Sequence, residues 1–311
     1  MDALVVAEIA VAAVQDVLFA LAAGMLAVRL MTSGIGGAAA GAGAPRWSRW
    51  QGGAALALAC ALAVYLWLQA AVMSGSPLAE AGSAVTAVLT ESHFGLAWSV
   101  GCAGAAVMAL GGFFSAGRAG RPGGSGATVT ALGALVYAAG RAAESHAADT
   151  GDFTLREAVH VVHLGSTALW AGSVIVSAVL LRRRETALSG GPQRAAFCSR
   201  LSQLATAALA IVAATGIYNA IQDTAHTVGP LLGEAYGRVL AAKLVLVCAT
   251  VLLGGANRMV FLPRMQVAAA SGDAALAQVQ AQRRFGQLLA VEALAMLGVL
   301  IVAAVLGHTS P

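Results

Sequence analysis

The sequence has few charged residues and almost no lysine. Aspartate, glutamate, lysine and arginine make up 10% of its 311 residues, against roughly 25% in ordinary soluble domains, and only one of its cations is a lysine. Hydrophobic residues make up 59% of the chain, and a mean hydropathy of +0.80 is typical of repeated membrane-spanning segments. We therefore expect an integral membrane protein that is embedded in a lipid bilayer.

Other absences exclude several functional classes. The net charge of +4 is spread between apolar stretches, which argues against a nucleic-acid interface. No nucleophile elbow, Walker lysine or HExxH motif occurs, so we do not expect an enzyme. The cysteines are dispersed without a CxxC pair, which favours packing roles over disulfides or iron–sulfur ligation. They are Cys60, Cys102, Cys198 and Cys248.

The apolar stretches are long enough to cross a bilayer as helices, which takes roughly 20 residues each. Transmembrane barrel strands would be shorter and would alternate in polarity. The sequence therefore predicts an all-α, polytopic transmembrane helical bundle with eight spans. The predicted spans are 8–30, 51–73, 93–114, 127–148, 156–181, 197–222, 238–258 and 285–307.

The charges predict the direction of these spans. Four connections and the adjoining helix ends carry fourteen of the eighteen cations; the connections are 31–50, 115–126, 182–196 and 259–284. The positive-inside rule places these loops in the cytoplasm and both termini outside, on the periplasmic side. We expect two halves, 1–150 and 151–311, each with four spans, integrated into one membrane domain.

All six histidines fall at the predicted outer face. His160 and His163 are spaced i, i+3, which places both rings on one face of a helix. Imidazole ligands, with Met73 nearby, suit copper or zinc, and the Irving–Williams order favours copper. An isolated histidine at a membrane interface is more often a structural side chain, so the pair is the stronger candidate. The predicted metal ligands are His93, His160, His163, His146, His226, His308 and Met73.

Several polar residues fall inside the predicted spans. A carboxylate at the bilayer centre is costly, so Asp16 should face the bundle interior, with Lys243 as a possible counter-ion. Glu292 is within reach of Arg258, and we expect an ion pair there, with a pathway role as the alternative. The predicted transport pathway comprises Asp16, Glu8, Lys243, Asn219 and Glu292.

Short motifs along about half of the chain resemble one known family. In the second half they are His163-Leu164-Gly165 with Ala168-Leu169-Trp170-Ala171-Gly172, Thr215-Gly216-Ile217-Tyr218-Asn219-Ala220, Tyr236-Gly237-Arg238-Val239-Leu240 with Lys243, Asn257-Arg258, and Arg283-Arg284 with Glu292. In the first half, Glu91-Ser92-His93-Phe94-Gly95-Leu96-Ala97-Trp98 resembles the start of a family helix. In this order they resemble the CopD/PcoD copper-resistance membrane proteins.

The resemblance implies a helical bundle in the bacterial inner membrane that takes part in periplasmic copper handling. It implies a periplasmic copper-binding protein of the CopC type as partner, and movement of copper across the membrane. Carried over residue by residue, it favours His93 and His163 as ligands.

Two other functions fit the same residues. In a b-type haem electron-transfer protein, His93 and His163 would ligate the iron from different helices. In a copper sensor or donor, the outer face would bind copper without transport, since no ladder of His, Met or Cys continues toward the cytoplasm.

Overall fold

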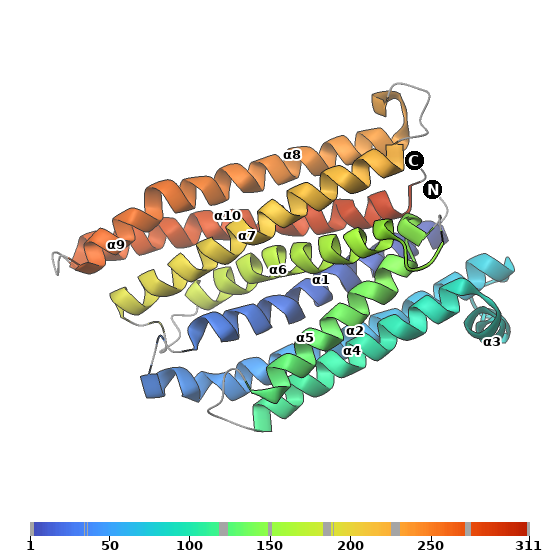
Figure 1. Cartoon of the computed structure of the whole chain (residues 1–311), viewed down its shortest axis with the longest axis horizontal. Helices are drawn as coiled ribbons and strands as arrows, with labels where there is room; N and C mark the ends of the chain where they lie inside the picture. Colours follow the sequence, from blue (N-terminus) through green and yellow to red (C-terminus); the bar gives the residue numbers. More distant parts are fainter. Residues whose placement is uncertain are drawn as a thin grey trace.

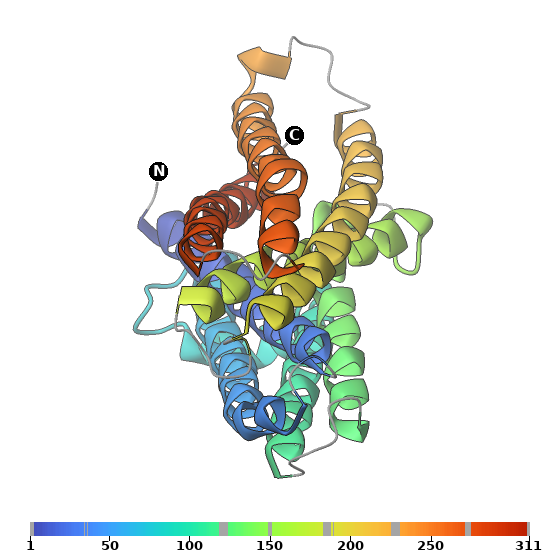
Figure 2. The ribbon, with the colours of Figure 1, turned by 90° about the vertical axis from the view of Figure 1, so that its left-hand side faces the viewer.

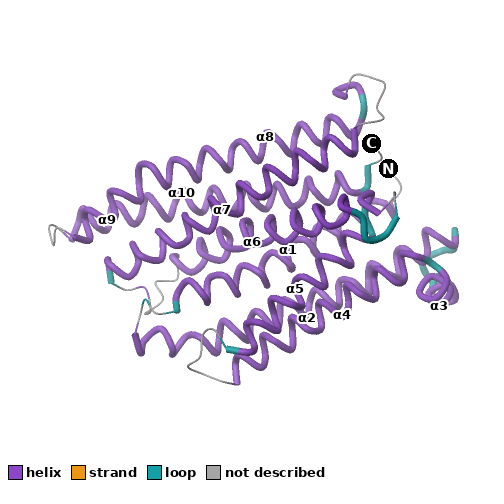
Figure 3. Tube along the Cα trace, viewed as in Figure 1, coloured by secondary structure: helices purple, strands orange, loops and turns teal. Residues whose placement is uncertain are grey.

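All regular secondary structure in the described part of the chain is helical. The computed structural model describes residues 3–33, 35, 37–117, 124–148, 151–182, 188, 190–224, 231–270 and 275–309, and these contain no strand (Figure 3). The elements are α1 (Ala3–Thr32), α2 (Gly37–Ser74), α3 (Gly82–Glu91), α4 (His93–Gly117), α5 (Ser125–Ala143), η1 (His146–Ala148), α6 (Leu155–Arg182), α7 (Gly191–Thr224), η3 (Leu231–Gly233), α8 (Ala235–Ala256), the π-helical turn η4 (Asn257–Phe261), α9 (Leu262–Ala270) and α10 (Ala275–Gly307). The predicted all-α fold is confirmed.

The long helices lie side by side in an elongated bundle (Figure 1). The start of α1, the short helix α3 and the end of α10 lie at one end of the bundle, on the right in Figure 1. We call this the terminal end, and the opposite end, where α9 lies, the loop end. The predicted topology places the terminal end outside.

Seven helices are long and apolar enough to cross a membrane among the described residues. The helix α5, which corresponds to the fourth predicted span, is not one of them, so the predicted count of eight is not confirmed. Its 19 residues include three glycines, two threonines, a serine and an arginine. These small and polar residues suit contact with a neighbouring helix better than contact with lipid.

Glycines allow unusually close helix contacts in several places. On α4 and α5 they recur at intervals of seven residues, as Gly104 and Gly111 opposite Gly126, Gly133 and Gly140. A Cβ at Gly133 would lie 2.5 Å from the backbone nitrogen of Met108, and a Cβ at Gly24 of α1 would overlap the backbone of Gly172 on α6. Where lipid removes the hydrophobic driving force, such backbone approach lets van der Waals contact hold helices together.

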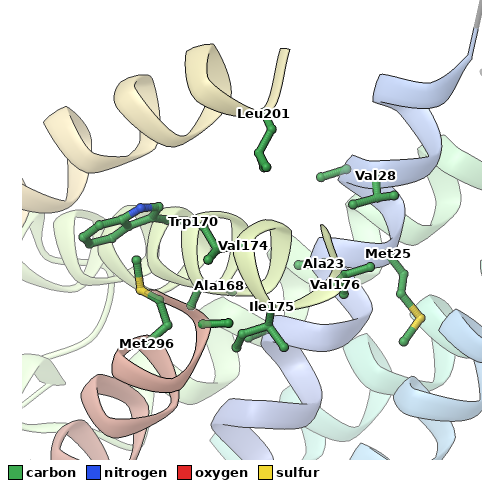
Figure 4. Close-up of a cluster of buried hydrophobic side chains, with 14 of the residues drawn as sticks. Ala23, Met25, Val28, Ala168, Trp170, Val174, Ile175, Val176, Leu201 and Met296 are labelled. Carbon is green, nitrogen blue, oxygen red and sulfur yellow. The ribbon is translucent and has the colours of Figure 1, made fainter. Parts of the chain in front are cut away.

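Helix α6 is the centre of the bundle. It packs against α1, α5, α7 and α10, and 72% of its most apolar stretch is buried, against 11% for α7 and 6% for α8. Figure 4 shows its Trp170 and Val174 among side chains from α1, α7 and α10. One hydrophobic cluster includes residues from both predicted halves of the chain, while their division at residue 150 stays a prediction.

Candidate metal site at the terminal end of the bundle

The terminal half of α6 carries the two histidines of the predicted pair. The rings of His160 and His163 are stacked at an interplanar angle of 23°, with their centroids 6.2 Å apart. His163 is buried, with 9% of its surface exposed, and His160 is half-buried. The i, i+3 spacing therefore produces the expected shared face, and α6 places that face inside the bundle.

The tautomer of His163 follows from its hydrogen bonds. The Thr215 hydroxyl donates its proton to the carbonyl of Ile211, one turn earlier on α7, at 2.6 Å. Its oxygen is then the acceptor for His163 Nδ1–H at 2.9 Å. The proton of a neutral His163 therefore sits on Nδ1, which leaves the lone pair of Nε2 for a metal ion. A Cβ on the next residue, Gly216, would lie 3.2 Å from Cε1 of His163.

Asn219 holds the second ring one turn further along α7. Its Nδ2–H donates to Nδ1 of His160 at 3.1 Å, and its Oδ1 is buried with no hydrogen-bond partner among the described residues. A half-turn of the amide exchanges its oxygen and nitrogen, so Oδ1 can instead accept a proton from His160 Nδ1–H. Asn219 can therefore serve either tautomer of His160, including the one that frees Nε2.

Three charged side chains from different helices interact electrostatically with one another or with this pair. Asp16 of α1 interacts with Arg141 of α5 and Lys243 of α8, and both cations also act on His160. Among the described residues no ion pair within 4.0 Å joins Asp16 to Lys243, so the two do not form the direct contact we considered. The predicted inward orientation of Asp16 fits this arrangement, because the carboxylate offsets two positive charges near the histidines.

Arg141 also forms an ion pair with Glu144 at the C-terminal end of α5. Its Nη1 lies 3.3 Å from Oε2 of Glu144.

Asp223 ties three helices together close to the pair. Its Oδ1 accepts from Arg156 Nη2 of α6 at 2.6 Å, and its Oδ2 accepts from the Tyr236 hydroxyl of α8 at 2.9 Å. Tyr236 is buried, so the second bond is shielded from solvent. This node fixes the terminal ends of α6, α7 and α8 relative to one another.

Two other predicted ligands, His93 and His308, make hydrogen bonds to residues outside the pair. His93 Nε2–H donates to Asp152 at 2.7 Å, with about half of each side chain exposed. His308 Nδ1–H donates to the carbonyl of Ala304 at 2.8 Å, and its Nε2 lies 3.1 Å from the Tyr65 hydroxyl.

Three predicted ligands remain. Met73 is 53% exposed, His146 lies in η1, and His226 lies outside the described residues. Within the described ranges no three His, Cys, Asp or Glu side chains converge as a metal-binding group.

Two predicted pathway acids are buried. Glu8 has 5% of its surface exposed, and its Oε1 has no hydrogen-bond partner among the described residues. Glu292, midway along α10, accepts from Asn257 Nδ2 at 3.4 Å. The expected Glu292–Arg258 ion pair is wrong: Arg258 Nη1 instead donates to the Thr206 hydroxyl and, at 3.5 Å, to the carbonyl of Ser202, both on α7.

Sequence reasoning missed three residues of the terminal site, namely Arg141, Thr215 and Asp223. A signal existed for two of them. Arg141 is a cation inside the predicted span 127–148, and Thr215 belongs to the same short motif as Asn219. Asp223 resembled any other loop acid, because only the packing of α6 against α7 reveals its partner.

The fold and this site define a class: a polytopic helical membrane protein with a histidine pair inside one end of the bundle. Residues 1–156 match the family described as Copper resistance protein D-like, N-terminal domain. Residues 195–306 match the family described as Copper resistance protein D. The chain therefore belongs to the copper resistance protein D family. No curated protein and no solved structure matches it.

Proposed function

We propose that this protein binds copper through His160 and His163 at the terminal end of the bundle and carries it across the bacterial inner membrane. The observation that carries the proposal is the inward-facing pair of imidazoles, in which Thr215 holds the His163 proton on Nδ1. Hydrogen bonds from Nδ1–H to a second side chain are the usual support of a metal-binding histidine. Family membership supports copper as the ion.

The separation of the two rings suits a shared ion. Two imidazoles that bind one metal at metal–nitrogen distances of about 2.0 Å have centroids no more than roughly 6.3 Å apart. The observed 6.2 Å lies within this limit, so the spacing of the two rings is compatible with one shared ion. Two histidines on the same face of one helix cannot bind opposite faces of a haem, so the haem alternative needs His93 as its second ligand, and the His93 ring is half-exposed and bonds Asp152 instead.

The surrounding charges tune the site for a cation. Arg141 and Lys243 disfavour a metal ion near His160, while Asp16 offsets them. The carboxylate of Asp16 is thus the group that makes the interior tolerable for a positive ion.

A route toward the loop end continues along α6 and α7. Trp170 follows His163 by seven residues, or about 10 Å along the helix, and it lines a cavity of about 160 Å³ near the loop end. Leu209 of α7 lines the same cavity, less than two turns from Thr215. Copper that leaves the histidines therefore has a space to enter further down the same helix pair.

The terminal end faces the periplasm in this proposal. The positive-inside rule supports that orientation. Exposed acids at this end, including Glu80, Glu91 and Asp152, would concentrate cations at the entrance. A periplasmic copper-binding protein of the CopC type would deliver the ion. The protein would act as a transporter and not as an enzyme.

The test combines binding and transport by the full chain. Copper binding is measured in nanodiscs and copper uptake in proteoliposomes, for the parent and for His160→Ala with His163→Ala. We expect the double variant to lose both. His93→Ala is the comparison: its ring pairs with Asp152 at the surface, so we expect it to retain uptake.

Three results would overturn parts of this proposal. Unchanged copper binding in the double variant would exclude the histidine pair as the site. Copper binding without uptake by the parent would exclude transport and favour a copper sensor or donor. A Soret absorption band in the purified protein would favour the haem alternative.

A further inference from the structure

Both apolar and polar side chains line the cavity of about 160 Å³. Its walls come from α6, α7, α8, η4 and α10. Helix α7 packs on α6 and α9, whereas α8 packs on α10, and Figure 2 shows α7 and α8 set apart. In Figure 4, Leu201 of α7 points toward α6, where Trp170 and Val174 form an apolar part of the wall. At roughly 30 Å³ for each water molecule, the cavity has room for about five.

Glu292 is a buried acid in this wall, midway along α10. It has 4% of its surface exposed, and no cation lies within 4.0 Å of it among the described residues. A hydrogen bond comes from the Asn257 amide, whose Nδ2 lies 3.4 Å from Oε2 of the acid. Inside a membrane an ionised carboxylate is costly, whereas a protonated carboxyl group is neutral. An acid in this position is therefore a candidate to carry a proton.

The Asn257 amide can bond to either form of this acid. Its Nδ2–H donates to the ionised carboxylate, while its Oδ1 is buried without a hydrogen-bond partner among the described residues. A half-turn of the amide exchanges its oxygen and nitrogen, and Oδ1 then accepts the O–H of the protonated carboxyl group. The contact between Asn257 and Glu292 therefore serves the acid with its proton and without it.

Arg258 supplies a positive charge to the same wall without pairing with the acid. It lines the cavity, but its Nη1 donates to the Thr206 hydroxyl and, at 3.5 Å, to the carbonyl of Ser202, both on α7. Within the π-helical turn η4, Asn257 is buried and Arg258 is exposed. A cation in the same cavity favours the ionised form of Glu292, and the lack of a direct ion pair leaves the protonated form accessible.

One further titratable group belongs to the described lining of the cavity. It is Cys198 of α7, a buried thiol. The lining residues of α6 and α8 carry no charge, and the other two helices that pack against α10, α1 and α9, contribute no residue to the described lining. The carboxyl group of Glu292 is therefore the group of this wall that suits reversible proton binding.

We propose that Glu292 binds the proton that is exchanged for copper during transport. The inference rests on the proposed function, because it names the ion that is coupled to copper. When the acid ionises, the carboxyl O–H bond breaks, the proton passes to water in the cavity, and the carboxylate keeps the bond from Asn257 Nδ2–H. A copper cation that enters the cavity repels the proton and favours the carboxylate. Passage of copper and release of the proton are thereby linked.

The test measures copper uptake by the full chain in proteoliposomes, at equal pH on both sides and with an acidic interior. Exchange predicts that the acidic interior speeds uptake by the parent severalfold. It should not change uptake by Glu292→Gln, which keeps the side-chain shape but binds no proton. Glu144→Gln is the matched control, because it removes an acid that pairs with Arg141 and does not line the cavity, and it should keep the parent's response.

Infrared spectroscopy without copper gives a second readout that does not depend on transport. The parent spectrum should contain a carbonyl band of a protonated carboxylic acid that disappears as the pH is raised and is missing in Glu292→Gln. Asn257→Leu bonds to neither form of the acid, so it should shift the pH at which this band disappears. An unshifted band would remove Asn257 from the site.

The outcomes separate the two proposals. If Glu292→Gln keeps the response to the acidic interior or the full carbonyl signal of the parent, the proton site is wrong. Copper uptake by the parent that ignores the acidic interior would also refute the exchange. If the parent binds copper without uptake, the proposed transport is wrong, and the infrared titration still decides whether Glu292 exchanges a proton. A thermal unfolding curve like the parent's identifies each variant as folded.

Discussion

Replacing Thr215 with valine tests whether a hydrogen bond tunes the His163 ligand. Valine has nearly the same shape as threonine but has no oxygen to accept the His163 Nδ1–H bond of 2.9 Å. The ring then keeps only the backbone of Val212 as a partner, so its proton is free to move to Nε2, which removes the lone pair that binds the metal. Loss of such a support typically weakens metal binding 10–100-fold, which corresponds to about 1.4–2.7 kcal/mol.

The assay is a copper titration of the protein in nanodiscs against a chelator of known affinity. Thr215→Val should bind copper 10–100-fold more weakly than the parent, and Thr215→Ser, which restores the hydroxyl, should recover most of the affinity. The thermal midpoint separates lost folding from lost affinity. An affinity within twofold of the parent's, in a folded Thr215→Val protein, would refute the assigned tautomer.

Three further predictions concern packing, charge and backbone strain. Gly133→Leu should push α5 away from α4 and greatly lower the yield of folded protein, measured by size-exclusion chromatography, whereas an undiminished yield would contradict the close contact. Asp16→Asn leaves Arg141 and Lys243 without their acid, so copper affinity should fall at least severalfold in the same titration, and unchanged affinity would show that the charges do not act on the site. Phe153 has a φ of 57° and is 99% exposed, so Phe153→Gly should raise the free energy of unfolding by about 0.5–1 kcal/mol, and a lower thermal midpoint would contradict that expectation.

Much of the helical fold follows from local chemistry. Long apolar stretches must satisfy their backbone hydrogen bonds internally in lipid, so they predict helices before any packing is known. The span at 127–148 shows the limit of this reasoning. Its glycines and threonines lower its apolar character. Only the packing of α4 against α5 shows that these small residues allow close helix contact.

For the candidate sites too, some contacts follow from the sequence and others only from helix packing. Periodicity alone predicts that His160 and His163 share a face, because residues three apart on a helix are neighbours. Periodicity does not show that Thr215 and Asn219 face those rings, since that depends on how α6 and α7 pack. It also gave the wrong partner for Glu292: reach along the chain suggested Arg258, but the π-turn buries Asn257 beside the acid and leaves the arginine exposed.

The amino-acid sequence by itself determined a membrane-embedded helical protein, the segregation of its charges, and the histidine pair, since these depend on composition and on contacts within single helices. The tertiary structure decided which polar groups meet: the histidines with α7, Asp16 with two cations, and Glu292 with an unpartnered amide oxygen. The physical reason is that these polar groups take their partners from other helices, so the partners depend on how the helices rotate and how closely they approach, which glycine contacts help to decide.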